Sequence, residues 1–132
     1  MGAWGLLFDE NDDAADWLGD FGESPSWASV TEALAITDVD YVEAPEACSA
    51  LAAAEIVAAS LGKPSLRLEG SSIEWAATQP EEGAARREQA IAALIRVRDD
   101  SELNELWEDT GEYAQWQASV NETLARLGKE AS

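Results

Sequence analysis

Residues 45–62, PEACSALAAAEIVAASLG, form the most apolar segment of the chain, and they predict its central helix. Proline is favoured in the first turn of a helix, and glycine is favoured just after the last turn. Pro45 and Gly62 occupy these two positions, and Pro64 follows shortly after. A membrane span needs about 20 strongly apolar residues, and alanine is only a weak hydrophobe. We therefore expect a buried helix inside a globular protein.

Glu55 is the only charged residue between Glu46 and Lys63 in this segment. Its apolar neighbours predict that it is at least partly buried, and a buried carboxylate usually needs a partner. The candidate partners are a tryptophan indole N–H, exposed backbone amides of the N-terminal segment, or an arginine such as Arg87, Arg96 or Arg98. We predict that Glu55 is a structural hydrogen-bond hub, with a role in a functional site as the alternative.

The rest of the chain predicts an all-α protein with one compact domain of about six helices and an extended N-terminal arm over residues 1–8. Besides the central helix, apolar residues recur at helical spacing in five segments: 12–21, 25–36, 80–98, 102–110 and 112–127. Ser24 and Pro25 are expected to start the second helix, and residues 99–101 to cap the helix at 102–110. Residues 65–79 are less regular and could hold one short strand. A chain of 132 residues can bury a single core without disulfides.

Several side chains outside the central helix are also expected to face the core. They include Tyr41 and Val42 in the connector, Ala84, Ala85 and Ile95 in the 80–98 helix, and Leu106 in the 102–110 helix.

The first twenty-one residues, MGAWGLLFDENDDAADWLGDF, carry the most distinctive combination of side chains. At 100° per residue, Ala14, Trp17, Leu18 and Phe21 fall on one side of a helix, and Asp12, Asp16 and Asp20 fall on the other, with Asp13 beside them. We expect the apolar side, together with Trp4 and Phe8, to pack on the core, so that Trp4 and Trp17 join Glu55 as structural hubs.

Like charges four residues apart destabilise a helix by about 0.2–0.5 kcal/mol per pair, so local stability does not favour this row of aspartates. Solvation of an exposed helix face is the simplest explanation for it. The functional alternative is a surface for a basic partner, which would use Asp9, Asp12, Asp13, Asp16 and Asp20.

The net charge is −19, and it is unevenly distributed. No Lys or Arg precedes Lys63, whereas thirteen of the 27 acidic residues lie in residues 1–62. Such a field repels nucleic-acid phosphates and anionic membranes and attracts basic proteins. Acidity shared by all proteins of the organism is the alternative explanation. With no signal peptide visible and a single cysteine, we expect a cytoplasmic protein.

The chain contains no histidine, which excludes imidazole bases, Ser-His and Cys-His nucleophile pairs, and the common zinc sites. Cys48 is therefore expected to be an inert core residue. The phosphate-binding patterns GxxxxGK and GxGxxG are absent. Asp9-x-Asn11-x-Asp13 has the spacing of the start of a calcium loop, but Ala14 stands where the loop needs glycine, and Asp20 where it needs glutamate. We predict no enzyme activity, no cofactor and no metal.

The opening segment is similar to the N-terminal signature of a small bacterial family known only as a domain of unknown function. Its members begin with MG-x-WG, a phenylalanine and an NDDAxDW-like segment. Residues 51–58, LAAAEIVA, and 101–107, SELNELW, resemble the same family, which implies a match over the whole chain. Leu6 and Leu7 stand where many members carry glycine. The resemblance implies a fold, but no activity.

We therefore predict a small acidic binding protein of the immunity, antitoxin or inhibitor type, whose carboxylate-rich N-terminal half binds a basic partner. One alternative is an accessory domain whose acidity is organism-wide and whose site lies elsewhere, for example in a groove lined by Trp4, Trp17 and Trp75. A less favoured alternative is a protein that binds divalent cations.

Overall fold

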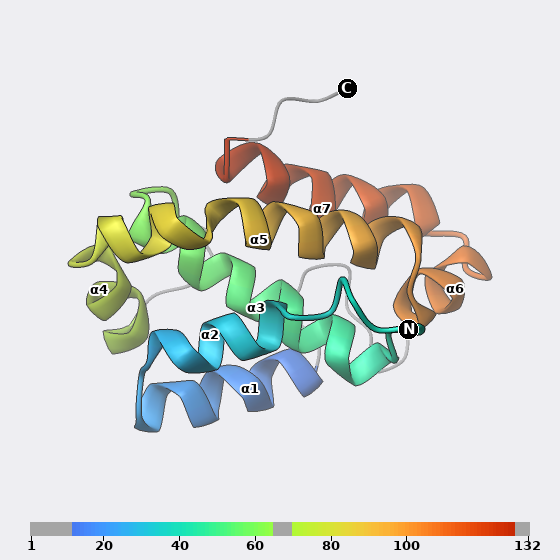
Figure 1. Cartoon of the computed structure of the whole chain (residues 1–132). Coiled ribbons are helices and arrows are strands. Elements are labelled where there is room, and N and C mark those ends of the chain that lie inside the picture. Colours follow the sequence, from blue (N-terminus) through green and yellow to red (C-terminus); the bar gives the residue numbers. More distant parts are fainter. Residues whose placement is uncertain (1–11, 65–69, 129–132) are drawn as a thin grey trace.

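The computed structural model describes residues 12–64 and 70–128, which form seven helices and no strand (Figure 1). The all-α class is therefore confirmed, while the arm over residues 1–8 lies outside the described ranges. The helices are α1 (Asp12–Glu23), α2 (Trp27–Leu34), α3 (Ala44–Ser60), α4 (Ser71–Ala77), α5 (Pro80–Asp99), α6 (Glu102–Glu108) and α7 (Tyr113–Arg126).

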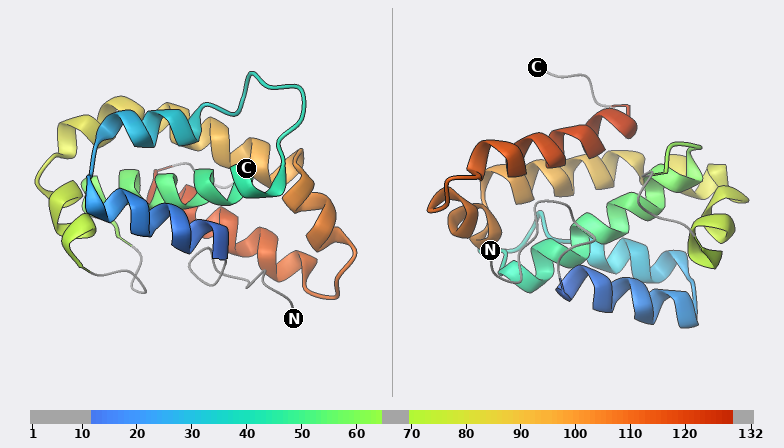
Figure 2. Two further views of the ribbon diagram at one scale, coloured as in Figure 1. Left: turned by 90° about the horizontal axis from the view of Figure 1, so that it is seen from below. Right: turned by 180° about the vertical axis from the view of Figure 1, so that it is seen from behind.

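Helix α3 is the centre of the bundle, as predicted. It packs against each of the other six helices, most extensively against α5. In Figure 1, α1 and α2 lie on one side of α3, while α5 and α7 lie on the other, as they do in the right view of Figure 2. Every residue from Leu51 to Ser60 is buried. Because half of these side chains are alanine, neighbouring helices can approach α3 closely from all sides.

The contact between α3 and α5 depends on a glycine. A Cβ atom added at Gly83 would lie 2.8 Å from the Cβ of Ser60 and 3.2 Å from the carbonyl oxygen of Val57. Ser60 cannot turn away without a loss, because its buried hydroxyl donates a hydrogen bond of 2.7 Å to the Val57 carbonyl. Gly83 therefore sets the distance between the two helices.

The helix ends follow local side-chain chemistry. The hydroxyls of Ser26 and Ser101 accept hydrogen bonds from backbone amides at the start of α2 and α6, at 3.2 and 3.1 Å. The cap at Ser101 agrees with the prediction, whereas the start at Ser24 and Pro25 is wrong, because Ser26 is the capping residue. Gly62 and Gly128 follow α3 and α7 with φ of 82° and 93°, the left-handed conformation that glycine adopts readily.

The sequence predicts no helix in residues 65–79 and leaves one short strand as a possibility, but the described part of this segment contains a helix. Residues 71–77 form helix α4 rather than part of a strand, which brings the described helices to seven. Gly70, with φ of 119°, lets the chain change direction before α4, and Ala76 is then fully buried. Such a short helix offers less than two full periods of hydrophobic pattern, so periodicity could not identify it.

Four side chains predicted to face the core are exposed instead: Tyr41, Ala84, Ala85 and Leu106. Tyr41 precedes Val42 in a connector where neighbouring side chains point in opposite directions, and Val42 is the one that is buried. In α6 the core positions are taken by Leu103 and Trp107. In α5 the close approach of Gly83 to α3 turns Ala84 and Ala85 outward, while Ile95 is half-buried.

Replacing Gly83 with alanine should destabilise the protein by about 1–3 kcal/mol, the usual result of overpacking a filled contact. The matched control is Gly19→Ala in α1, where an added Cβ meets nothing within 4 Å. That change should stabilise the helix by about 0.5–1 kcal/mol, because alanine is the better helix former. Urea unfolding of both variants measures the two free energies. Equal effects would show that the α3–α5 contact tolerates a methyl group.

Candidate functional site

Helix α1 has the two faces that its sequence predicts. Phe21 is 3% exposed, Trp17 and Leu18 are half-buried, and Asp16 and Asp20 are exposed one turn apart. Asp9 and Trp4 lie outside the described residues. The backbone of Asp12 and Asp13 belongs to α1, but their side chains are also outside the description.

The acidic surface extends well beyond α1. The described side chains between residues 16 and 46 include eight carboxylates, and all eight are exposed: Asp16, Asp20, Glu23, Glu32, Asp38, Asp40, Glu43 and Glu46. We call this set the acidic surface. None of its members forms an ion pair within the described ranges. No described Lys or Arg therefore neutralises its negative charge through an ion pair.

The arginines that the structure describes lie on α5 and α7 and are used inside the fold. Arg86, Arg87, Arg96 and Arg98 pair with Glu82, Glu88, Asp100 and Asp99 at 2.8–3.2 Å, all within α5 or at its end. Arg87 also donates to the carbonyls of Leu127 and Gly128 after α7, at 2.5 and 3.1 Å. These four arginines are thus paired with carboxylates outside the acidic surface, although Arg96 also reaches the carbonyl of Asp40 within that segment.

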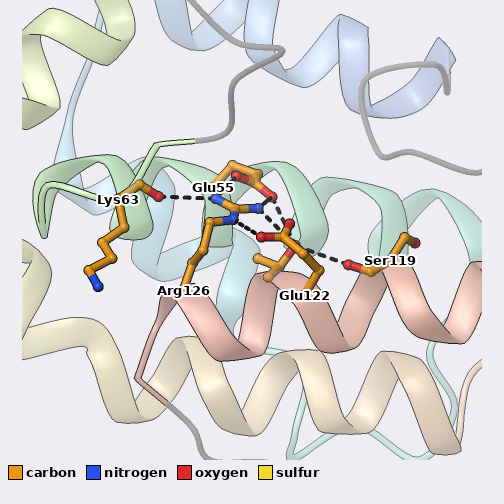
Figure 3. A network of polar contacts seen from close by, with 6 residues as sticks. Glu55, Lys63, Ser119, Glu122 and Arg126 are labelled. Atoms are coloured by element: carbon orange, nitrogen blue, oxygen red, sulfur yellow. Dashed lines mark hydrogen bonds and ion pairs between the residues drawn. The ribbon is translucent and has the colours of Figure 1, made fainter.

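Glu55 forms the buried polar centre of the molecule (Figure 3). Its side chain is 1% exposed, and its two carboxylate oxygens accept hydrogen bonds from the two terminal nitrogens of Arg126, at 2.8 and 2.7 Å. The Thr123 hydroxyl lies 3.0 Å from Glu55 Oε2 and 3.3 Å from the Ser119 carbonyl, and it can donate to either. The ion pair joins the middle of α3 to the last turn of α7.

Arg126 is satisfied on its other side as well. Its Nε donates to Glu122 at 2.6 Å, and Nη1 donates to the carbonyl of Lys63 at 3.1 Å. Burial disfavours the charged form of Arg126, but the hydrogen bonds to Glu55 and Glu122 outweigh burial and raise its pKa above the ordinary value. Because Glu55 has both oxygens occupied, its arrangement is that of the predicted structural hub.

The partner of Glu55 is an arginine, one of the kinds of partner predicted, but it is none of the three arginines named as examples. The backbone amides of the N-terminal arm lie outside the described residues. Arg87, Arg96 and Arg98 bind other groups, and the partner is Arg126, with Thr123 beside it. These two residues are three positions apart and so share a face of α7. That spacing was a usable signal, but nothing in the sequence identifies which helix faces Glu55.

Four aromatic residues of α1, α2 and α4 form a second cluster, at the end of the bundle where α4 lies. Trp17 stacks on Phe21 with ring centroids 5.1 Å apart, and Trp75 contacts both Phe21 and Trp27, at 5.6 and 5.2 Å. Arg86 lies over the Trp27 ring at 5.2 Å, a cation–π contact. Trp17 thus joins α1 to its neighbours, consistent with the predicted packing role, while the groove with Trp4 remains a hypothesis.

The described part of the chain shows no arrangement of side chains suited to cysteine chemistry or to metal binding. Cys48 is fully buried. No three Asp, Glu or Cys side chains are grouped so that they could hold a metal ion in residues 12–64 and 70–128. Residues 12–20, the later part of the calcium-loop pattern, are helical. No helix in these ranges has the length and apolarity needed to cross a bilayer.

The sequence model of one protein family, described as Domain of unknown function (DUF4259), matches residues 2–119. The chain belongs to this family. No curated protein and no solved structure matches it. The match includes Glu55 but ends before Thr123 and Arg126, so the expected coverage of the whole chain is not reached at the C-terminal end.

Removal of Arg126 tests the structural role of the Glu55 centre. Arg126→Ala should destabilise the protein by about 3–5 kcal/mol, because it leaves a buried carboxylate without its counter-ion. Glu122→Gln removes only the exposed partner of the same arginine and should cost at most about 1 kcal/mol. The double variant Glu55→Met with Arg126→Met should recover most of the lost stability, since an apolar pair of similar volume needs no counter-ion.

Thermal and urea unfolding of these three variants give the comparison. A small loss in Arg126→Ala, equal to that of Glu122→Gln, would contradict a structural role for the buried pair.

Proposed function

We propose that this protein is a non-enzymatic binding protein that recognises a basic protein partner through the acidic surface of residues 16–46. The observation that supports it is the exposure of all eight carboxylates in this segment, without an ion pair to any described residue. A binding protein of the immunity, antitoxin or inhibitor type would use such a surface. The alternative, acidity common to the whole organism, predicts the same charge without a partner.

The arrangement suits fast association with a cationic surface. Unpaired carboxylates on α1 and in the α2–α3 connector add their fields, which raises the encounter rate with a basic partner at low ionic strength. The same field disfavours direct contact with nucleic acids and anionic membranes. Each described arginine pairs with a carboxylate outside the acidic surface, which offsets much of its positive charge, although Arg96 contacts the connector at the Asp40 carbonyl.

The proposal predicts that charge on α1 matters more than charge elsewhere. We expect the double variant Asp16→Asn with Asp20→Asn to lose most of a basic partner recovered from the native organism at low salt. The control, Glu81→Gln with Glu108→Gln, removes two exposed carboxylates without ion pairs from α5 and α6 and should retain it. Quantitative pull-down with mass spectrometry measures recovery across a series of salt concentrations.

Both double variants change the net charge by the same amount, so a difference between them reports the position of the charge. Equal recovery by the two variants would refute a specific role for α1 and would favour organism-wide acidity as the origin of the charge.

A further inference from the structure

Three large hydrophobic side chains of the described ranges are exposed: Val39 at 38%, Tyr41 at 47% and Leu106 at 40%. Val39 and Tyr41 lie in the connector between α2 and α3, which stands out from the helices in the left view of Figure 2, and Leu106 lies on α6. The connector and α6 are joined by a backbone hydrogen bond of 2.9 Å from Glu102 N to the Val42 carbonyl. We call these three side chains the Tyr41 patch.

The connector is held in place although two of its side chains face the solvent. Arg96 donates to the carbonyls of Ile36, Thr37 and Asp40 at 3.2–3.4 Å. Ile36 and Val42 are buried, and Glu102 Oε1 accepts a hydrogen bond of 2.8 Å from the Ala44 amide. A segment fixed at both ends presents Val39 and Tyr41 in a defined position, which lowers the entropy lost on binding.

The border of the Tyr41 patch is acidic. Asp38, Asp40 and Glu43 lie beside Val39 and Tyr41 in the connector and are exposed, and so is Glu105 next to Leu106. Partial burial and the nearby carboxylates of Glu105 and Glu102 raise the pKa of Tyr41. The backbone hydrogen bond from Glu102 to the neighbouring Val42 places this part of the connector beside α6. Arg96 lies beneath the connector and is already engaged by its carbonyls and by Asp100.

We propose that the Tyr41 patch is the apolar contact point for a basic, amphipathic segment of a protein partner. An apolar side chain of that segment packs against Val39, Tyr41 and Leu106, and flanking lysines or arginines pair with the carboxylates around them. This inference rests on the proposed function and adds a defined apolar site to it. Exposed tyrosines at the centre of an interface often contribute a large part of the binding energy.

Charge complementarity selects this occupant over the others. A second copy of the chain would bring acidic borders together, since each copy carries −19. An anionic membrane surface would be repelled by the same carboxylates. A segment with both apolar and basic side chains satisfies the centre and the border together.

The test uses a defined probe, a short amphipathic peptide of lysine and leucine, and a second peptide in which serine replaces leucine. Binding is measured by isothermal titration calorimetry, and the contact residues are mapped by amide chemical shifts. We expect the lysine–leucine peptide to bind more tightly than the lysine–serine peptide and to shift the signals of Val39, Tyr41 and Leu106.

Tyr41→Ala with Leu106→Ala should weaken binding of the lysine–leucine peptide by about tenfold or more. Tyr41→Phe keeps the ring, removes only the hydroxyl, and should change affinity by less than about twofold. Because the replaced side chains are exposed, circular dichroism should show all of these variants folded.

Unchanged affinity in the double alanine variant would overturn the inference, and so would equal binding of the two peptides. If the wild-type protein bound the two peptides equally well, and if the variant Asp16→Asn with Asp20→Asn bound both less well, the acidic surface would be supported and the Tyr41 patch would not. If the wild-type protein bound neither peptide, both the acidic surface and the Tyr41 patch would lose support. If the wild-type protein were a dimer and the variant Tyr41→Ala with Leu106→Ala a monomer, the patch would be a self-association site and the inference would be wrong.

Discussion

The structure depends on one constraint, the burial of α3 on all sides. Ten consecutive residues from Leu51 to Ser60 are inaccessible to solvent, and most of them are alanines and other small residues. Small side chains allow six helices to contact one central helix, but they also leave little room for adjustment. The close approach of Gly83 to Ser60 is a direct consequence, because at that point even a methyl group has no space.

A helix without a solvent-facing side cannot carry a charge unless another element supplies its counter-ion. Glu55 therefore requires Arg126, and the resulting ion pair fixes the last turn of α7 against the middle of α3. Arg126 also holds the carbonyl of Lys63 just after α3, so one guanidinium joins the helix, the turn that follows it and α7. An ion pair with both carboxylate oxygens occupied accounts for the burial of an acid at this position.

Sequence patterns predicted most of the helices because their apolar residues recur over two or more turns. They failed at α4, which is too short to show a period, and at Tyr41 and Leu106, where two apolar residues compete for one inward position and the neighbour is buried. The two faces of α1 were predictable from the 100° step alone. The partner of Glu55 was not, because Arg126 is 71 residues away and its position depends on how α7 packs.

The charged side chains are used differently in the two halves of the chain. The described arginines stabilise the helices of the second half, whereas the eight carboxylates of residues 16–46 have no ionic partner within the described ranges. Neutralising them removes no ion pair and reduces repulsion such as that between Asp16 and Asp20, one turn apart. The carboxylates of Glu43 and Glu46 contribute to folding through the capping box that begins α3. The other six form no side-chain hydrogen bond or ion pair with the described residues, and we propose that they act on what the surface meets in solution. The Tyr41 patch lies within the same charged region, so a partner attracted by the carboxylates would meet an apolar contact held in position by Arg96.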